Sequence, residues 1–183
     1  MDEWESKIKA IVENTWNKDV NSLSGVPSWM LVLIKAVLKK TGREYLTDVW
    51  PNLEVFFHGG ISFEPYREQY KTLIPSNKMH YMETYNASEG FFGLQDDPTD
   101  SSLLMMPDYG IFYEFIPMNE VGNAHPTVLP LESVETGKNY AMVITTSGGL
   151  WRYQIGDTVR FTSLFPHKFV ISGRTKHFIN AFG

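Results

Sequence analysis

The chain has 183 residues, of which 43% are hydrophobic and 20% are charged, and its formal net charge at pH 7 is −5. This balance is ordinary for a folded protein with a sizeable core, and the negative charge argues against broad attraction to nucleic acid or to an anionic membrane. The absence of cysteine excludes disulfides, thiolate nucleophiles and cysteine-ligated zinc, and it is compatible with a reducing compartment.

No segment predicts export or membrane insertion. Residues 1–10 are acidic and amphipathic and lack the basic, apolar and small-residue order of a signal peptide. The longest apolar run, residues 29–38, is interrupted by Lys35 and is too short to span a bilayer. We therefore expect a cytoplasmic protein that has neither nucleic acid nor a membrane as a partner.

Two amphipathic helices open the chain. Apolar residues recur at helical spacing over residues 2–17 and again over residues 28–41, so each helix should pack one face into a core. A turn at Gly25 separates the two helices. Ser28 is expected to cap the second helix, and Gly42 is expected to end it.

A strand, a helix and a second strand follow. Residues 53–60 are a short apolar run bounded by a proline and a pair of glycines, which is typical of a strand buried on both faces. Pro65 is well placed to start a helix that ends before Pro75, and residues 78–85 then alternate as a strand. Such a βαβ unit should have parallel strands and a right-handed crossover.

The second half predicts short strands and turns without helical periodicity. After the polar residues 95–102, LLMM and IFYEFIP flank PDYG, which suits a hairpin with Asp108 and Gly110 in its loop. NYAMVITT and LWRYQIGDTVRF flank SGG as a second hairpin, and KFVISGR adds a strand. The expected fold class is α/β followed by mainly antiparallel β, with a helical and α/β domain over residues 1–95 and an antiparallel sheet or small barrel over residues 96–183.

The segment YNASEG places an aromatic ring, a hydroxyl and a carboxylate at the end of a predicted strand. Ligands bind at the carboxyl ends of strands in open α/β sheets. This trio suits a nucleotide, because Tyr85 offers a ring face to a base, Ser88 a donor to a phosphate oxygen, and Glu89 an oxygen ligand to Mg²⁺. An ordinary strand-ending turn contains the same residue types, so both interpretations stay open.

Two further polar groups stand where the β pattern does not explain them. Asp157 follows a glycine in an otherwise apolar strand, and an acid beside a nucleotide commonly accepts hydrogen bonds from ribose hydroxyls. Arg174 and Lys176 follow a glycine at a strand end, where a guanidinium suits phosphate or hydroxyl recognition. The alternatives are a bulge with a solvated aspartate and a plain basic turn.

A pair of glycines, Gly59 and Gly60, follows the first buried strand. Glycines at such a place allow the backbone to approach a flat ligand closely. Equally, the pair can simply turn the chain.

Other chemistries find little support in the residues. TTSGGLWR lacks the Walker pattern and has predicted strands on both sides, which indicates a hairpin turn. The five histidines show no metal-site spacing, and there is no GxSxG nucleophile elbow. Aromatic residues could line a sugar-binding face, but Phe56, Phe57, Phe91 and Phe92 stand where a core needs them.

The order YNASEGFFG, YGIFYEFIP, WRYQIGDTVRF and SGRTKHFINAFG resembles the succession of motifs in the auxin-responsive Gretchen Hagen family of acyl acid amido synthetases. That family is part of the adenylate-forming group, which includes acyl-CoA synthetases, peptide-synthetase adenylation domains and firefly luciferase. The resemblance covers roughly residues 53–183. It implies a partial adenylate-forming N-terminal domain, a βαβ subdomain with a small distorted β-barrel.

The resemblance also implies roles for individual residues. Tyr85 would stack on adenine, Ser88 would lie near the α-phosphate, and Glu89 would hold Mg²⁺. Asp157 would bind both ribose hydroxyls, and Arg174 would contact ribose or phosphate.

Three positions match the borders of the family's site. Gly59 and Gly60 match glycines beside adenine and the acyl pocket. Lys176 lies near the hinge to the family's C-terminal domain.

Two departures limit the resemblance. Nothing in residues 1–52 resembles the family's Ser/Thr/Gly-rich phosphate loop, and the C-terminal domain with its catalytic lysine would follow Gly183. The chain therefore looks like a central fragment, and we expect little adenylation activity from it alone.

For the intact enzyme the resemblance implies use of ATP, AMP and Mg²⁺ to activate a carboxylic acid as acyl-AMP, which an amine such as an amino acid then attacks. The partners expected are a small carboxylic acid, an amine or CoA acceptor, and the remainder of the parent polypeptide. A thioester-forming CoA ligase stays open, as does a non-catalytic module that binds a sugar or a small acid.

Overall fold

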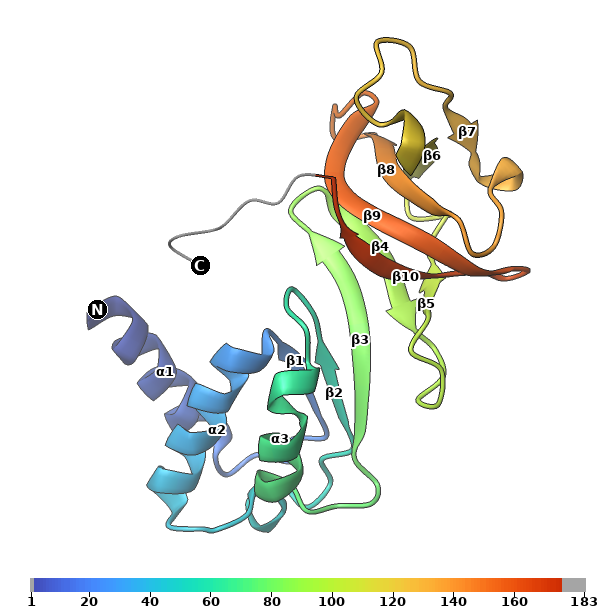
Figure 1. The fold of residues 1–183 in the computed structure, drawn as a ribbon. Helices are drawn as coiled ribbons and strands as arrows, with labels where there is room; N and C mark the ends of the chain where they lie inside the picture. The colour runs from blue at the N-terminus through green and yellow to red at the C-terminus, as the bar shows by residue number, and fades with distance from the viewer. Residues whose placement is uncertain (1, 176–183) are drawn as a thin grey trace. The chain divides into compact units, whose positions relative to one another are not determined.

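The computed structural model describes residues 2–175 of the chain (Figure 1). It divides into two compact units, Met1–Thr84 and Tyr85–Gly183, which are described separately. The division lies within one strand, earlier than the boundary after residue 95 that the sequence suggested. Within residues 2–175 no helix is both long enough and apolar enough to cross a lipid bilayer.

The first unit is a small parallel sheet with helices packed on it. Its elements are α1 (Asp2–Thr15), β1 (Ser22–Gly25), α2 (Pro27–Thr41), the 3₁₀ helices η1 (Leu46–Asp48) and η2 (Glu64–Tyr66), β2 (Val55–His58), α3 (Arg67–Leu73) and the greater part of β3 (His80–Ala87). Both β1 and β3 pair with β2 in parallel, so the predicted βαβ arrangement of β2, α3 and β3 is confirmed in its strand direction. Apolar residues of α2, α3 and the strands share one buried cluster that includes Ile34, Phe56, Tyr70 and Met79.

Two local predictions in this unit were wrong. The chain around Gly25 is a strand, β1, and not only a turn, because Leu23 is buried and pairs with Phe56 of β2. Ser28 does not cap α2: the residue before the helix is Val26, which makes no side-chain capping bond, and Pro27 occupies the first turn, where its missing N–H costs nothing. The predicted stop at Gly42 is confirmed, since its N–H bonds to the Leu38 carbonyl oxygen with φ at 67°.

The second unit is an antiparallel sheet. Its elements are β4 (Gly90–Gln95), β5 (Leu103–Met105), β6 (Ile111–Pro117), η3 (Met118–Glu120), β7 (Leu129–Pro130), η4 (Leu131–Ser133), β8 (Asn139–Thr146), β9 (Tyr153–Leu164) and β10 (His167–Arg174). The order across it is β4-β5-β10-β9-β8-β6-β7.

The hairpin predicted around SGG is confirmed as β8 and β9, and the strand predicted from KFVISGR is β10. The hairpin predicted around PDYG was wrong, because β5 lies between β4 and β10 while β6 pairs with β7 and β8. Both edges of the three-residue β5 are already paired, with β4 and β10, and β6 pairs with β8 over its whole length.

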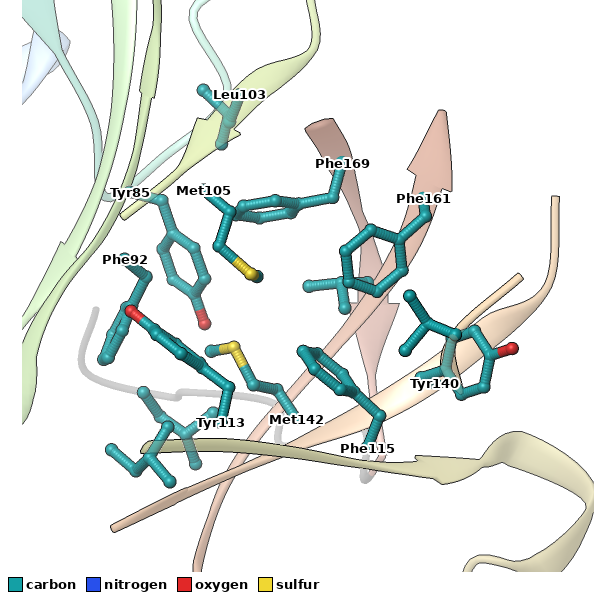
Figure 2. Packing of buried hydrophobic residues seen from close by; sticks show 14 of the residues in the cluster. Tyr85, Phe92, Leu103, Met105, Tyr113, Phe115, Tyr140, Met142, Phe161 and Phe169 are labelled. Atoms are coloured by element: carbon teal, nitrogen blue, oxygen red, sulfur yellow. The ribbon is translucent and has the colours of Figure 1, made fainter. Parts of the chain in front are cut away.

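The core of the second unit is rich in aromatic rings and methionine (Figure 2). Phe92, Phe115, Phe161 and Phe169 are completely buried. In Figure 2 the rings of Phe115 and Phe161 approach each other from different strands, while Phe92 lies beside Tyr85 and Tyr113. Tyr85, the first residue of this unit, belongs to the same cluster. The core therefore fixes the position of a residue that the sequence assigned to the site.

Candidate functional site

Three of the site residues proposed from the sequence meet around one carboxylate in the second unit. Asp157 on β9 lies directly opposite Arg174 on β10. The Tyr85 hydroxyl donates to Asp157 Oδ2 at 2.6 Å, and Arg174 Nε donates to Oδ1 at 2.9 Å. The Asp157 side chain is only 17% exposed. It is thus a held carboxylate and not the solvated aspartate of the alternative interpretation.

The backbone around Asp157 departs from regular strand geometry. Gly156 has φ at 91°, a conformation that favours glycine, and the β9–β10 register shifts between Ile171 and Gly173. The irregular stretch is bonded across the two strands, with Thr175 N donating to the Gly156 oxygen at 2.8 Å. A glycine in this strand therefore lets the chain kink and present Asp157 beside Arg174.

The ring of Tyr85 is buried rather than offered to solvent. Its exposed fraction is 6%, and its centroid lies 4.9 Å from that of Phe92 and 6.1 Å from that of Phe169. Burial, reinforced by the hydrogen bond to Asp157, raises the pKa of Tyr85 far above its ordinary value. The phenol therefore remains protonated, and it is the hydrogen-bond donor to the carboxylate.

Ser88 and Glu89 form the turn between β3 and β4, as the sequence predicted. Ser88 is exposed and Glu89 is half-buried, and Glu89 makes no ion pair within residues 2–175. The charge of Glu89 is one of the influences that raise the pKa of Tyr85, so the turn lies within electrostatic range of the Asp157 cluster.

A magnesium ion would find a limited donor set in this part of the chain. In residues 2–175 there is no group of three or more His, Cys, Asp or Glu side chains that could hold a metal. Mg²⁺ is commonly bound by one or two carboxylates together with substrate phosphates and waters. A single free carboxylate such as Glu89 fits that mode and does not fit an all-protein metal cage.

Gly59 and Gly60 belong to the first unit, where packing alone accounts for the first of them. A Cβ on Gly59 would collide with the backbone carbonyl oxygen of Thr84 on β3, and Thr84 Oγ1 in turn donates to the His58 carbonyl oxygen at 3.2 Å. Gly60 has φ at 82°. Lys176, the remaining site residue from the sequence, lies outside the described residues.

The second unit also contains a surface groove that the sequence did not reveal. It has a volume of about 610 Å³ and lies at the ends of β6 and β8. Its walls include Phe112 and Trp151, which are 61% and 82% exposed, together with Ile111, Asp108, Thr145, Thr146 and Ser147. The available signal was Phe112, whose outward position alternates with those of the buried Ile111 and Tyr113.

Two family models match the chain. The GH3 family N-terminal domain matches residues 1–79, and the GH3 family central domain matches residues 104–174. Among relatives, indole-3-acetic acid-amido synthetase GH3.4 of Arabidopsis thaliana is 31% identical over 166 residues, and GH3.8 of Oryza sativa subsp. indica is 37% identical over 128 residues. These matches cover 85% and 64% of this chain, but only 26% and 20% of the relatives' own length.

Solved structures agree with this assignment at the level of the fold. The GH3.15 acyl acid amido synthetase covers 94% of this chain with a TM-score of 0.67 and 19% identity, and the chain spans 40% of that protein. A long-chain-fatty-acid-CoA ligase from Archaeoglobus fulgidus covers 92% with a TM-score of 0.58 and 14% identity, and the chain spans 37% of it. The fold is that of part of the N-terminal domain of adenylate-forming enzymes, and the chain belongs to the GH3 family.

Proposed function

We propose that this chain forms part of the nucleotide site of an ATP-dependent acyl acid amido synthetase. In the proposed reaction a carboxylate attacks the α-phosphate of ATP, the bond to pyrophosphate breaks, and the acyl-adenylate then reacts with an amine to give an amide and AMP. The observation that carries the proposal is the Asp157 carboxylate, held by donors from two directions in a chain of this family.

Asp157 has the acceptor capacity that a ribose requires. An ionised carboxylate offers about four lone-pair sites on two oxygens. The hydrogen bonds from Tyr85 and Arg174 occupy one site on each oxygen, so both oxygens can still accept a hydroxyl. A vicinal diol presents two hydroxyls at matching separation, and Asp157 would orient the nucleotide by binding it.

Ser88 and Glu89 are the groups proposed to act at the phosphates. The exposed Ser88 hydroxyl would donate to an α-phosphate oxygen, and Glu89 would hold the magnesium ion. Bound there, Mg²⁺ would neutralise the charge that builds on the phosphoryl oxygens as the carboxylate attacks. No residue of the chain needs to form a covalent intermediate. Arg174 is 58% exposed, so the rest of its guanidinium is available to a phosphate or a ribose oxygen.

The acid and the acceptor are proposed only by class. The relatives are named for indole-3-acetic acid and, in one case, for 4-substituted benzoates and glutamate, so an aromatic carboxylic acid and an amino acid are the first choices. A structural neighbour is a 2-hydroxyisobutyryl-CoA ligase, so thioester formation with CoA is the alternative acceptor chemistry.

Thermal melts with and without Mg-ATP or AMP test the proposal. Either nucleotide should raise the melting temperature of the chain, because a ligand that binds only the folded state stabilises it. Asp157→Ala should abolish that rise while costing only about 1–3 kcal/mol of folding stability, the penalty for leaving the Tyr85 hydroxyl without its acceptor.

Asp108→Ala is the matched control, since it removes an exposed aspartate from the same unit and should leave the rise intact. If Asp157→Ala weakened folding as strongly as it weakened nucleotide binding, Asp157 would have a structural role only.

A second candidate function rests on the groove beside Phe112 and Trp151. Exposed aromatic rings flanked by hydroxyls suit the face of a sugar or a small flat acid, in a binding module without catalysis. A melting shift produced by an oligosaccharide alone, and lost in Trp151→Ala, would favour this candidate over the nucleotide site.

A further inference from the structure

We propose that the groove beside Phe112 and Trp151 binds an alkylammonium group, the charged form that a primary amine takes at neutral pH. The inference deepens the proposed function, because it gives the amine acceptor a place to dock, and it rests on that function only for the role of the ligand in the reaction. Binding of an ammonium ion in the groove can be measured without any nucleotide.

The two aromatic walls of the groove offer their rings to a ligand. Phe112 is 61% exposed and Trp151 is 82% exposed. A cation that lies over an aromatic ring is attracted by the negative charge of the ring face, and tryptophan attracts it most strongly. The cation–π contact found in residues 2–175 joins Arg67 to Phe63 in the first unit, so within that range no side-chain cation occupies the rings of the groove.

The carboxylates around the groove outnumber the cations. Asp108 lines the groove, and it makes no ion pair within residues 2–175. Glu114 lies two residues beyond Phe112 on β6, on the same face of the strand, and it pairs with Arg152 at 3.1 Å. Two carboxylates therefore stand against one guanidinium, and this balance favours a cationic ligand over a neutral sugar or an acid.

Arg152 does not fill the groove itself, because its groups are engaged elsewhere. Its Nε donates to Glu114 Oε2 at 3.1 Å, and its backbone N–H donates to Thr145 Oγ1 at 3.0 Å. Its φ of 47° is uncommon for a residue other than glycine, so the chain directly after Trp151 is strained and these two bonds maintain it. Backbone strain of this kind gathers at ligand-binding sites, which agrees with a binding role for the exposed ring.

The groove lies beside the turn that is proposed to act at the phosphates. Gly90 follows Glu89 directly, and a Cβ on Gly90 would lie 2.6 Å from Ile111 Cδ1, so the turn packs against a residue that lines the groove. The ring of Phe91 lies 5.8 Å from that of Tyr109, in the loop before β6. The amine must attack an acyl carbon that is joined through oxygen to the α-phosphate, so a docking groove beside this turn suits the acceptor.

Three probes of similar shape and different charge test the inference, namely cyclohexylammonium, cyclohexanol and cyclohexanecarboxylate. NMR titration of the full chain follows the indole N–H of Trp151 and the backbone amides of Thr145 and Thr146. The ammonium probe should bind about tenfold more tightly than the alcohol, and the carboxylate should bind most weakly, because the ring faces and Asp108 attract only the cation. Added salt should weaken the binding of the ammonium probe and leave that of the alcohol unchanged.

Two variants separate the contributions of the ring and of the charge. Trp151→Leu keeps an apolar side chain and removes the ring face, so it should weaken the ammonium probe about fivefold and the alcohol less than about twofold. Asp108→Asn should weaken the ammonium probe about threefold and reduce its dependence on salt. Trp29→Leu and Glu132→Gln are the matched controls, because each changes an exposed residue that does not line the groove, and neither should alter the affinity.

The inference is overturned if the alcohol or the carboxylate binds within about twofold of the ammonium probe, if Trp151→Leu keeps the full affinity, or if the ammonium probe causes no shift. An oligosaccharide that shifts the Trp151 signal when the ammonium probe does not would assign the groove to the second candidate function. The thermal melts with Mg-ATP and AMP test the nucleotide site separately. A chain that binds the ammonium probe and no nucleotide would retain the groove as a site and refute the proposed function, and the opposite result would refute the groove alone.

Discussion

His58, at the end of β2, is a buried histidine whose Nδ1 has no hydrogen-bond partner in the described structure. Its ring is 4% exposed and stacks on Phe63 at 4.3 Å between centroids. Burial is the main cause that lowers the pKa of His58 to about 4. The positive charge of Arg67 lowers this pKa further, and its effect is larger than the opposite effect of the negative charge of Glu64. The neutral imidazole is therefore part of the folded core.

This lowered pKa predicts a specific loss of stability in acid. The unfolded chain protonates His58 near pH 6.5 and the folded chain only near pH 4, so the unfolded state binds more protons between these values. The contribution of the neutral His58 to the free energy of unfolding is complete above pH 6.5 and is lost as the pH falls toward 4. On its own it amounts to about 3 kcal/mol, from about 1.4 kcal/mol for each pKa unit.

Urea unfolding at pH 7 and pH 5 measures this effect. His58→Phe should keep the stacking on Phe63 and lose part of the difference in unfolding free energy between the two pH values. His80→Phe changes an exposed ring on β3 and is the control. An identical pH dependence in the wild type and His58→Phe would show that His58 gains its proton in the folded state as readily as in the unfolded one.

At the same scale, the sequence could nominate candidate site residues more readily than it could predict their contacts. Tyr85, Asp157 and Arg174 stand out because each is a polar group at a strand end or beside a glycine. The bond between Tyr85 and Asp157 joins positions 72 residues apart, and no local pattern encodes it. The burial of the Tyr85 ring depends likewise on Phe92 and Phe169 meeting from β4 and β10.

At the scale of elements, the approach of β2 to β3 depends on Gly59. Since a Cβ there would collide with the Thr84 carbonyl oxygen, which is backbone and cannot turn aside, Gly59→Ala must push the strands apart. We expect a loss of about 1–3 kcal/mol in unfolding free energy, the usual cost of overpacking. Thermal or urea unfolding of the full chain measures it.

Gly148→Ala is the matched control for this substitution. A Cβ at Gly148, in the turn between β8 and β9, would meet only Thr146 Oγ1 at 3.6 Å, an ordinary contact. Its effect should stay within about 0.5 kcal/mol. Gly59→Ala with an effect equally small would mean that the glycine is free to serve a ligand and is not required by the sheet.

The element errors share one physical cause. β1 has four residues with a single buried one, so it has too little alternation to be recognised, and its pairing with β2 defines it. The strands β5 and β6 are adjacent in the sequence but do not pair with each other, because β5 pairs with β4 and β10 while β6 pairs with β7 and β8. The β8–β9 hairpin was predictable because its two long strands flank a short glycine turn and pair with each other directly.

At the scale of the whole molecule, the two main hydrophobic cores of the described residues share no residue, and a smaller third cluster of Ile116, Ala141 and Val143 lies in the second unit. Every residue of the first buried cluster lies between Val12 and Met79, and every residue of the second lies between Tyr85 and Phe169. The sequence predicted the change from α/β to antiparallel β. It placed β4 with the first half, because the pairing of β4 with β5 is not visible in the residues of β4 themselves.

Separate cores predict that each can be destabilised without the other. Ile34 and Ile144 are both completely buried, one in each core, so Ile34→Ala and Ile144→Ala are the same chemical change in two places. Each should cost about 2–5 kcal/mol in its own unit, through lost burial and the cavity left behind. Buried methionines report on each core, since Met79 lies in the first and Met105 in the second.

Methyl NMR of the chain labelled at its methionines, followed through urea unfolding, separates the two cores. Ile34→Ala should move the Met79 transition to lower urea and leave the Met105 transition in place, because only the first core has lost contacts. Ile144→Ala should do the reverse, so each variant is the control for the other. If both methyls shifted together by the same amount in both variants, the two cores would form one cooperative unit despite sharing no residue.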